Sequence, residues 1–461
     1  MSTLVGISLI IIAAFNFGLI LIPYLMGKGE LMTIKNVFLV GFTIYQVTSG
    51  AISIFDPYSY TSELYLTNPD STTATYLAYV IIFEFVFLIM YRWGIGAKKF
   101  AHITPVIRGE PRESILWLFA FLLIFVALVL RITVRVPYVA VLTNHVGTST
   151  AAVAAGLGAW IWVRRPFNPV AMSMMVGILL LSIFVAIIGV FGRRPIVAVV
   201  GCTVWATYYS RWRFLPPRQV LVRALIFGII PVIIVAKYTT VRGQFYGSDM
   251  GSFQRMKIIA SASTKTGLVD LASGQECAAW SMWLIETHPD ILPYNHLHAI
   301  KYYFQLPIPR TIYHDKPTAL AVTAWRDAGV SGKPPGYTIG PGILGHAGAE
   351  GGFYALILYA AVTGLFVRYF DSILAKAPKQ PFVSLPIGAS LGNMLGMPRG
   401  ESPNFAFEFT VGVMGTFVML FIIAWFLKLI GYISSDDLNN TDELDDQSDA
   451  DPYDEYAGYG E

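Results

Sequence analysis

Residues 3–26 read TLVGISLIIIAAFNFGLILIPYLM, a run without a single charged side chain. About 20 apolar residues in helical conformation cross a hydrocarbon core of roughly 30 Å. The run has no basic leader and no Ala-x-Ala-like cleavage site, and it is long for the core of a signal peptide. We therefore expect a retained membrane helix at the start of the chain.

The rest of the chain has the same character. Its 461 residues are 55% hydrophobic and 13% charged, with a mean hydropathy of +0.58. Ordinary soluble domains are about 45–50% apolar and about 25% charged. The apolar runs are continuous and do not alternate as in a membrane β-barrel, so they indicate helices. The sequence predicts an all-α polytopic membrane protein.

Apolar runs of suitable length predict about eleven transmembrane helices, of which the seventh and tenth are short. They are expected near residues 3–26, 33–55, 72–91, 114–131, 146–163, 168–191, 195–210, 219–238, 351–370, 382–397 and 405–432.

Four regions follow from this pattern. An N-terminal transmembrane bundle is expected over residues 1–237, one long loop containing short helices over 238–350, and C-terminal transmembrane helices over 351–432. Residues 433–461 are rich in Asp and Glu and contain neither Lys nor Arg. Such a segment buries too little apolar area to offset the entropy of ordering, so we expect a disordered tail.

The distribution of Lys and Arg predicts the orientation, because cytoplasmic loops are the more basic ones. The richer set of alternating connections would be cytoplasmic together with the tail. The N-terminus, the long loop and the turn at residues 398–401 would face outward. The side expected to face outward still carries arginines near helix ends. They either extend to the lipid headgroups or bind an anionic ligand through their planar guanidinium groups. These residues are Arg131, Arg135, Arg193, Arg194, Arg242, Arg310 and Arg399.

Residues 238–350 contain five of the seven histidines. Short helices are expected near 252–262, 276–286 and 296–304. Their aromatic side chains suit either an interfacial belt or sugar stacking, and spacing does not separate the two. The aromatic residues are Trp280, Trp283, Tyr302, Tyr303 and Phe304.

The segment at residues 307–317 reads PIPRTIYHDKP. Its prolines fix φ and predict an extended, stiff backbone that presents Arg310, His314 and Lys316. Arg310 is a candidate phosphate contact. His314 with its neighbour Asp315 is a candidate base with an orienting carboxylate.

A glycine-rich passage at residues 336–352 leads into the ninth expected span. Many glycines predict close approach of the backbone to a ligand or a helix. Glu350 is expected at the N-terminal end of that span, where it either caps the helix or shares a site with His346. In the third span, Glu84 is expected to pair with an arginine such as Arg131 or Arg135, or to serve a proton path.

Several catalytic signatures are missing. There is no Walker-type loop, no Gly-rich nucleotide fingerprint, no His-Glu-x-x-His zinc site and no Gly-x-Ser-x-Gly elbow. Cys277 lacks the Cys-Ser-Gly setting of a thiol-dependent transpeptidase, and Asp56, Glu63 and Asp70 are too scattered for an acidic metal pair. We expect no metal site, no cofactor and no nucleic-acid partner.

The chain resembles the oligosaccharide repeat-unit polymerases, the Wzy-type O-antigen polymerases of bacterial envelopes. Three features carry the resemblance: Ile308-Pro309-Arg310 followed by Lys316-Pro317, the glycine-rich passage 340–352 with Glu350, and the Arg399-Gly400 pair between the last two expected spans. The plan of many helices with a long loop in the C-terminal half also agrees.

The resemblance implies a metal-independent glycosyltransferase at the outer face of the bacterial cytoplasmic (inner) membrane. Its donor would be a glycan on undecaprenyl pyrophosphate, and its acceptor the non-reducing end of a new lipid-linked unit. Besides membrane lipids, a chain-length regulator and a flippase are the partners it suggests.

The same resemblance implies roles for individual residues. Arg310 and Arg399 would bind pyrophosphate, with Arg242 a weaker match and Lys316 beside them. A base would be needed for the acceptor hydroxyl, and the candidates are His314, His346 and Glu350.

Two other functions remain open. An O-antigen ligase would use the same donor with a different acceptor. A flippase or transporter for lipid-linked sugars would show internal repeats and a two-sided charged cavity, and the sequence contains no convincing repeat.

Overall fold

In the computed structural model, the described residues are 2–56, 64, 66–107, 109, 111–133, 139–188, 193–245, 250–272, 276–330 and 338–434. Every element assigned within these ranges is a helix. Nine of the described helices are long and apolar enough to cross a membrane, counting α2 and α3 as one. The acidic segment beyond residue 434 lies outside the described residues.

The nine helices coincide with nine of the expected spans, and the second of them contains a π-helical turn at Thr43–Thr48. They are α1 (Ser2–Leu25), α2 with α3 (Ile34–Phe42 and Ser49–Phe55), α5 (Pro69–Trp93), α7 (Glu113–Thr133), α8 (Ala140–Arg164), α9 (Pro169–Ile187), α11 (Pro217–Val241), α18 (Phe353–Lys376) and α21 (Ser402–Leu429).

Two expected spans take another form. The seventh corresponds to α10 (Arg193–Ser210), a helix of 18 residues. The tenth is broken into α19 (Pro381–Gly388) and α20 (Leu391–Gly396), with Ala389 and Ser390 between them. Neither α10 nor this pair is among the nine helices that meet the length and hydropathy of a span.

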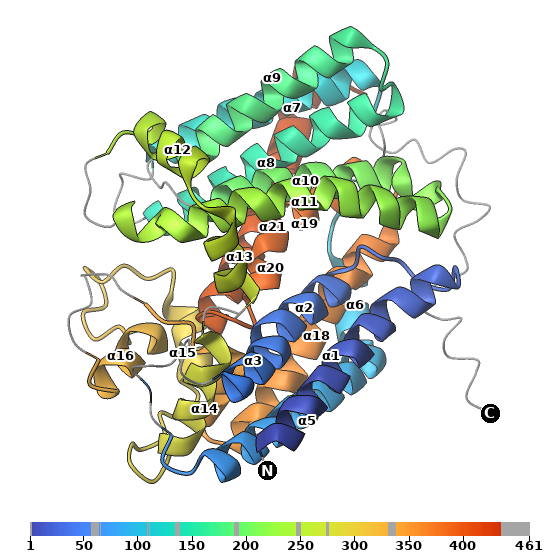
Figure 1. The fold of residues 1–461 in the computed structure, drawn as a ribbon. Helices are drawn as coiled ribbons and strands as arrows, with labels where there is room; N and C mark the ends of the chain where they lie inside the picture. The colour runs from blue at the N-terminus through green and yellow to red at the C-terminus, as the bar shows by residue number, and fades with distance from the viewer. Residues whose placement is uncertain are drawn as a thin grey trace.

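The helices form two groups joined by the C-terminal elements. Figure 1 shows α7 to α11 together in one group and α1, α2, α3, α5 and α6 (Ile95–Ile103) with α18 in the other, while α19, α20 and α21 run between them. Small side chains let α8 sit at the centre of its group. A side chain added at Gly156 would press against Cys202 of α10 and Leu385 of α19, so the close packing depends on that glycine.

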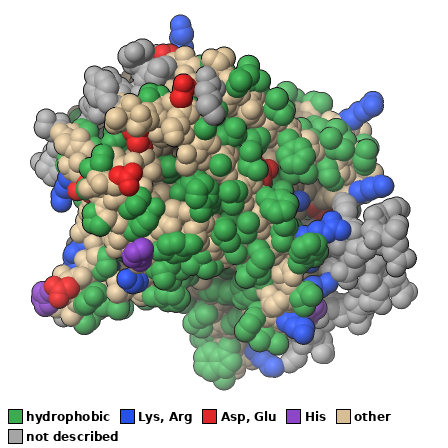
Figure 2. Space-filling view, turned by 90° about the horizontal axis from the view of Figure 1, so that it is seen from below, with side chains coloured by type: hydrophobic (Ala, Val, Ile, Leu, Met, Phe, Trp, Pro, Cys, Tyr) green, Lys and Arg blue, Asp and Glu red, His purple; other side chains and the backbone are tan. Residues whose placement is uncertain are grey.

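The outer surface of both groups is apolar. Large side chains such as Leu4, Phe85, Leu180 and Leu225 are more than half exposed. Figure 2 shows hydrophobic side chains over most of the face seen from below, with Lys and Arg gathered toward the right-hand edge. Exposed apolar area of this extent is unusual for a protein in water. The chain is a multi-pass membrane protein.

Two carboxylates, Asp371 and Glu286, cap helices other than their own. Asp371 of α18 accepts hydrogen bonds from the backbone N–H groups of Ile34 (2.7 Å) and Lys35 (3.0 Å) at the start of α2. Glu286 does the same for Thr67 (2.9 Å) and Asn68 (2.7 Å) before α5. The first N–H groups of a helix have no partner within it and lie at its positive end, so these carboxylates fix one helix against another.

Glu84 does not pair with Arg131. Its carboxylate accepts a hydrogen bond from Asn16 Nδ2 at 3.3 Å, while Arg131 donates to the carbonyl of Val185 at 3.3 Å and also to Ala186 and Asn144. Carbonyl oxygens at the end of α9 are closer to this guanidinium than any acid of α5 is. Of the alternatives for Glu84, pairing with Arg131 is excluded, and Arg135 lies outside the described residues.

The long loop contains the three expected short helices, α12 (Ser252–Ser261), α14 (Cys277–Thr287) and α15 (His298–Gln305). It also contains α13 (Thr264–Ala272) and α16 (Leu320–Asp327), which the sequence did not predict. Trp280 and Trp283 are buried in a hydrophobic cluster with Leu320 and Ala324 of α16. These two rings therefore pack the loop onto itself and belong neither to a belt nor to an open sugar platform.

Residues 307–317 are not extended as predicted. Backbone hydrogen bonds from Ile312 to Pro309 (3.0 Å) and from Lys316 to Tyr313 (3.3 Å) fold the segment into successive turns. Neither turn has a proline at its two central positions, so the fixed φ angles of the prolines do not oppose these local hydrogen bonds.

The glycine-rich passage forms a separate helix, α17 (Gly342–Glu350). The chain turns at Gly351 and Gly352, the latter with φ +64°, before α18 begins at Phe353. Glu350 therefore ends α17 and does not begin the ninth span. The prediction that it caps that span was wrong, because the two glycines interrupt the helix.

Candidate functional site

Most of the predicted site residues lie at one end of the bundle, where α14, α15 and α17 pack against α3, α5, α18 and α21. Figure 1 shows α14, α15 and α16 together at this end. At its centre is a buried triad of His346, Glu350 and Glu401. His346 Nδ1 is 2.8 Å from Glu350 Oε1, one helical turn along α17, and His346 Nε2 is 3.6 Å from Glu401 Oε1. The side chains are 0%, 1% and 9% exposed.

Each carboxylate of the triad caps a loop helix. Glu350 Oε2 accepts the backbone N–H of Ala299 at 2.8 Å, at the start of α15, and also the Tyr359 hydroxyl. Glu401 accepts the backbone N–H groups of Leu320 at 3.2 Å and Ala321 at 2.8 Å, at the start of α16. The Glu350 carboxylate therefore does interact with the positive end of a helix, but that helix is α15 and not the span that follows Glu350 in sequence.

The charges within the triad support each other. Burial disfavours the imidazolium, but Glu401 and Glu350 outweigh burial and raise the pKa of His346 above its usual value. His298, on α15 nearby, has its pKa lowered, mainly by burial, and its Nδ1 is 3.1 Å from Asn295 Nδ2. His346, between the two carboxylates, joins α17 to the caps of α15 and α16.

The turn at residues 307–317 presents Arg310, His314 and Lys316. Arg310 is exposed and donates to the carbonyls of Lys316 (3.2 Å) and Pro317 (3.4 Å). Lys316 Nζ donates to Leu306 and Ile308, and burial together with Arg310 lowers the pKa of Lys316. His314 is exposed on the same turn.

Tyr302 connects this turn with the triad. Its pKa is raised to about 12, by burial first and then by Glu401, while Arg310 acts in the opposite direction. The charges of Glu401 and Arg310 therefore both act on the Tyr302 phenol. The ring also stacks on His298, with the centroids 5.7 Å apart.

Arg399 lies in the turn between α20 and α21, with its guanidinium 5.8 Å from the centre of the Tyr45 ring. The Cys277 thiol donates to the Arg399 carbonyl at 3.2 Å, and burial raises the pKa of Cys277 to about 12. Arg242 lies in a short 3₁₀ turn after α11, and its side chain falls outside the described residues.

Glu401 is the residue that sequence reasoning missed. It stands two residues after Arg399 and caps α16, which begins shortly after the turn that carries Arg310. The structure therefore ties the two basic turns to one carboxylate and joins that carboxylate to His346. The available signal was an acid directly before Ser402-Pro403 at a helix start, but its partner could not be read from the sequence.

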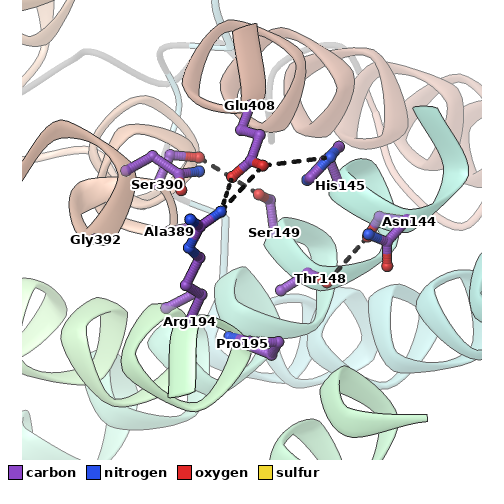
Figure 3. A pocket seen from close by; sticks show the side chains of 12 residues that line it. Asn144, His145, Thr148, Ser149, Arg194, Pro195, Ala389, Ser390, Gly392 and Glu408 are labelled. Atoms are coloured by element: carbon purple, nitrogen blue, oxygen red, sulfur yellow. Dashed lines mark hydrogen bonds and ion pairs between the residues drawn. The ribbon is translucent and has the colours of Figure 1, made fainter. Parts of the chain in front are cut away.

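A cavity of about 160 Å³ lies beside this region (Figure 3). Arg194 reaches from α10 toward Glu408 of α21, with Nη1 at 3.3 and 3.4 Å from the two carboxylate oxygens. His145 Nε2 is 3.8 Å from Glu408 on the other side. The cavity is lined by Asn144, His145, Thr148, Ser149, Arg194, Pro195, Ala198, Ala389, Ser390, Gly392, Asn393 and Glu408.

Of these lining residues, only Arg194 was singled out from the sequence, as one of the outward arginines. Glu408 lies within an apolar run, where it resembles an isolated charge. Within the described ranges, no three His, Cys, Asp or Glu side chains are placed to hold a metal ion together.

Comparison of the chain with protein-family models, with curated proteins and with solved structures finds no match in any of the three. The function must therefore be argued from the side chains themselves.

Proposed function

We propose that this protein is a membrane glycosyltransferase that polymerises undecaprenyl-pyrophosphate-linked oligosaccharide units at the outer face of the bacterial cytoplasmic membrane. One observation carries the proposal. The loop segment 298–350 and the turn at 398–401, which hold all the predicted site residues except Arg242, meet through His346 and Glu401 at one end of an apolar bundle.

The chemistry suits this arrangement. Pyrophosphate is a good leaving group, and guanidinium groups stabilise the charge that develops on it as the glycosidic bond to phosphate breaks. Arg310 is exposed at this end, and Arg399 is partly exposed there. Neither a metal nor a nucleotide is required for this step.

The triad serves this function by positioning. His346 and Glu350 are sealed from solvent, so an acceptor hydroxyl does not reach them. By capping α15 and α16, the triad fixes both ends of the segment that carries Arg310 and Lys316. We therefore assign His346, Glu350 and Glu401 as positioning residues for the basic turn.

The orientation follows from charge. The ends opposite the loop helices carry most of the basic residues, among them Lys98, Lys99, Arg164, Arg165 and Arg211. The positive-inside rule then makes those ends cytoplasmic and the loop helices extracytoplasmic. A membrane-bound donor exported to the outer leaflet would meet the site directly.

A strain lacking this protein provides the test. Its surface glycan, separated on a gel, is expected to shrink from a ladder to a single repeat. Arg310→Ala and Arg399→Ala should reproduce that loss, and Lys at either position should rescue poorly because it lacks the bidentate fork. Arg112→Ala, an exposed arginine at the opposite end, is the matched control and should keep the ladder.

Other outcomes would point to other functions. Loss of attached glycan while lipid-linked polymer accumulates would indicate a ligase with the same donor. Movement of a labelled lipid-linked unit across a reconstituted bilayer, without any new glycosidic bond, would indicate a flippase. An unchanged ladder in both arginine variants would refute the arginine assignment.

A further inference from the structure

The cavity between α8, α10 and α21 occurs where the short helices α19 and α20 are separated. Ala389 and Ser390, which separate α19 from α20, form part of its wall. Irregular backbone within an apolar bundle is tolerated where it is buried in protein or lines a polar cavity. Ser149 and Ser390 meet there, with their hydroxyl oxygens 3.4 Å apart.

The lining suits a neutral, hydroxyl-rich ligand. Apart from Arg194, Glu408 and His145, its polar side chains are hydroxyls and amides: Asn144, Thr148, Ser149, Ser390 and Asn393. The single guanidinium is already opposite a carboxylate, so the cavity carries no large excess of charge for an anion. Its volume is below the roughly 300–1,000 Å³ of pockets for larger ligands. One sugar ring is the appropriate size.

Glu408 is placed to accept a further hydrogen bond. Its side chain is 8% exposed, against 54% for Arg194, so the carboxylate forms the floor and the guanidinium the mouth. The Arg194–Glu408 contacts of 3.3 and 3.4 Å are long compared with about 2.7–2.9 Å for a tight charged pair. Asn404 Nδ2 donates a hydrogen bond to Oε1 at 2.7 Å, which fixes the carboxylate. Among the described residues, the hydrogen-bond contact of Oε2 is the long one to Arg194, and Figure 3 shows Arg194 facing Glu408.

We propose that this cavity is the acceptor subsite, where the terminal sugar of the acceptor glycan binds and Glu408 accepts the proton of its reacting hydroxyl. This inference rests on the proposed glycosyl transfer. The acceptor oxygen bonds to the anomeric carbon of the donor, and the bond from that carbon to the phosphate oxygen breaks. The electron pair leaves with undecaprenyl pyrophosphate, and the proton passes to Glu408.

His145 completes the proton path. Its Nε2 is 3.8 Å from Glu408 Oε1, and its side chain is 21% exposed. In this proposal the partly exposed imidazole, which lies next to the carboxylate, passes the proton on to solvent and so returns Glu408 to its ionised form after each transfer.

Glu408→Gln is the direct test, because it keeps the size and the bond to Asn404 but removes the proton acceptor. The assay uses the purified full-length protein in lipid nanodiscs with lipid-linked units extracted from a strain that lacks it. A general base contributes about 10²–10⁴-fold, so extension should slow by at least about 100-fold. Binding of the lipid-linked donor should remain. Glu84→Gln, another buried carboxylate in a spanning helix, is the matched control and should extend normally.

Asn393→Leu tests the subsite at a side chain that lines the cavity and is partly exposed. The KM for the acceptor should rise about tenfold, the cost of about one hydrogen bond, with donor binding unchanged. The subsite assignment is wrong if Glu408→Gln extends glycan at the normal rate, or if Asn393→Leu leaves the acceptor KM unchanged. If Arg399→Ala still abolishes extension in that case, the proposed glycosyl transfer stands. If the unmodified protein forms no glycosidic bond, the proposed function itself fails.

Discussion

Replacing Glu401 by alanine should release the start of α16. The side chain is 9% exposed, and its carboxylate accepts two backbone N–H groups, from Leu320 and Ala321. A hydrogen bond to a charged acceptor contributes about 1.5–3 kcal/mol, and loss of a helix cap costs about 1 kcal/mol. We expect the free energy of opening α16 to fall by about 2–3 kcal/mol.

The assay is amide hydrogen exchange followed by mass spectrometry on peptides covering residues 320–327. A loss of that size should speed exchange there roughly 30- to 150-fold. The reciprocal control is Glu286→Ala, which removes the cap at Thr67 and Asn68 and should speed exchange before α5 without touching α16. Unchanged exchange in α16 of the Glu401 variant, or an equal rise there in the Glu286 variant, would refute the capping argument.

Three further predictions concern the loop. Because Glu401 and Glu350 raise the pKa of His346, the contribution of this residue to stability is complete below pH about 6.5 and is lost as the pH rises through the raised pKa. Hydrogen exchange in α15 and α16 should therefore increase at alkaline pH, and His346→Gln should remove this dependence. The same pH response in the variant would contradict the prediction. Gly342→Ala should lower the thermal unfolding midpoint more than Gly329→Ala. Both glycines have φ near +70°, but only at Gly342 would a side chain overlap Gln46, Pro398 and Cys277. Equal shifts of the midpoint would show that this close packing does not matter. Cys277 is fully buried with a raised pKa, so a maleimide should not label it at neutral pH until the protein is denatured, and rapid labelling of the folded protein would reopen a thiol-dependent mechanism.

Hydropathy alone located the membrane helices because a span is a local property of about 20 residues. Prediction from hydropathy was least accurate where a helix is interrupted. Nothing in the apolar run 382–397 required the break at Ala389 and Ser390, which packing against α8 and α10 stabilises. The pair Gly351-Gly352 is evident in the sequence, but whether it ends a helix depends on the tertiary packing of α17.

The site was predicted in part. His346 and Glu350 are together as expected, since four residues along one helix place them on one face. Glu401 and Glu408 could not be paired with His346 and Arg194 from sequence, because those partners lie in distant segments brought together only by folding. Buried carboxylates that cap distant helices leave no local pattern, which is why the triad was seen only in part.

The most direct measurement of the central claim is the product of the purified protein, reconstituted in a bilayer with lipid-linked units on one side. We expect longer lipid-linked glycan, with one molecule of undecaprenyl pyrophosphate released for each new glycosidic bond. Units that cross the bilayer unjoined, or that remain unjoined with no release of the lipid pyrophosphate, would contradict the account.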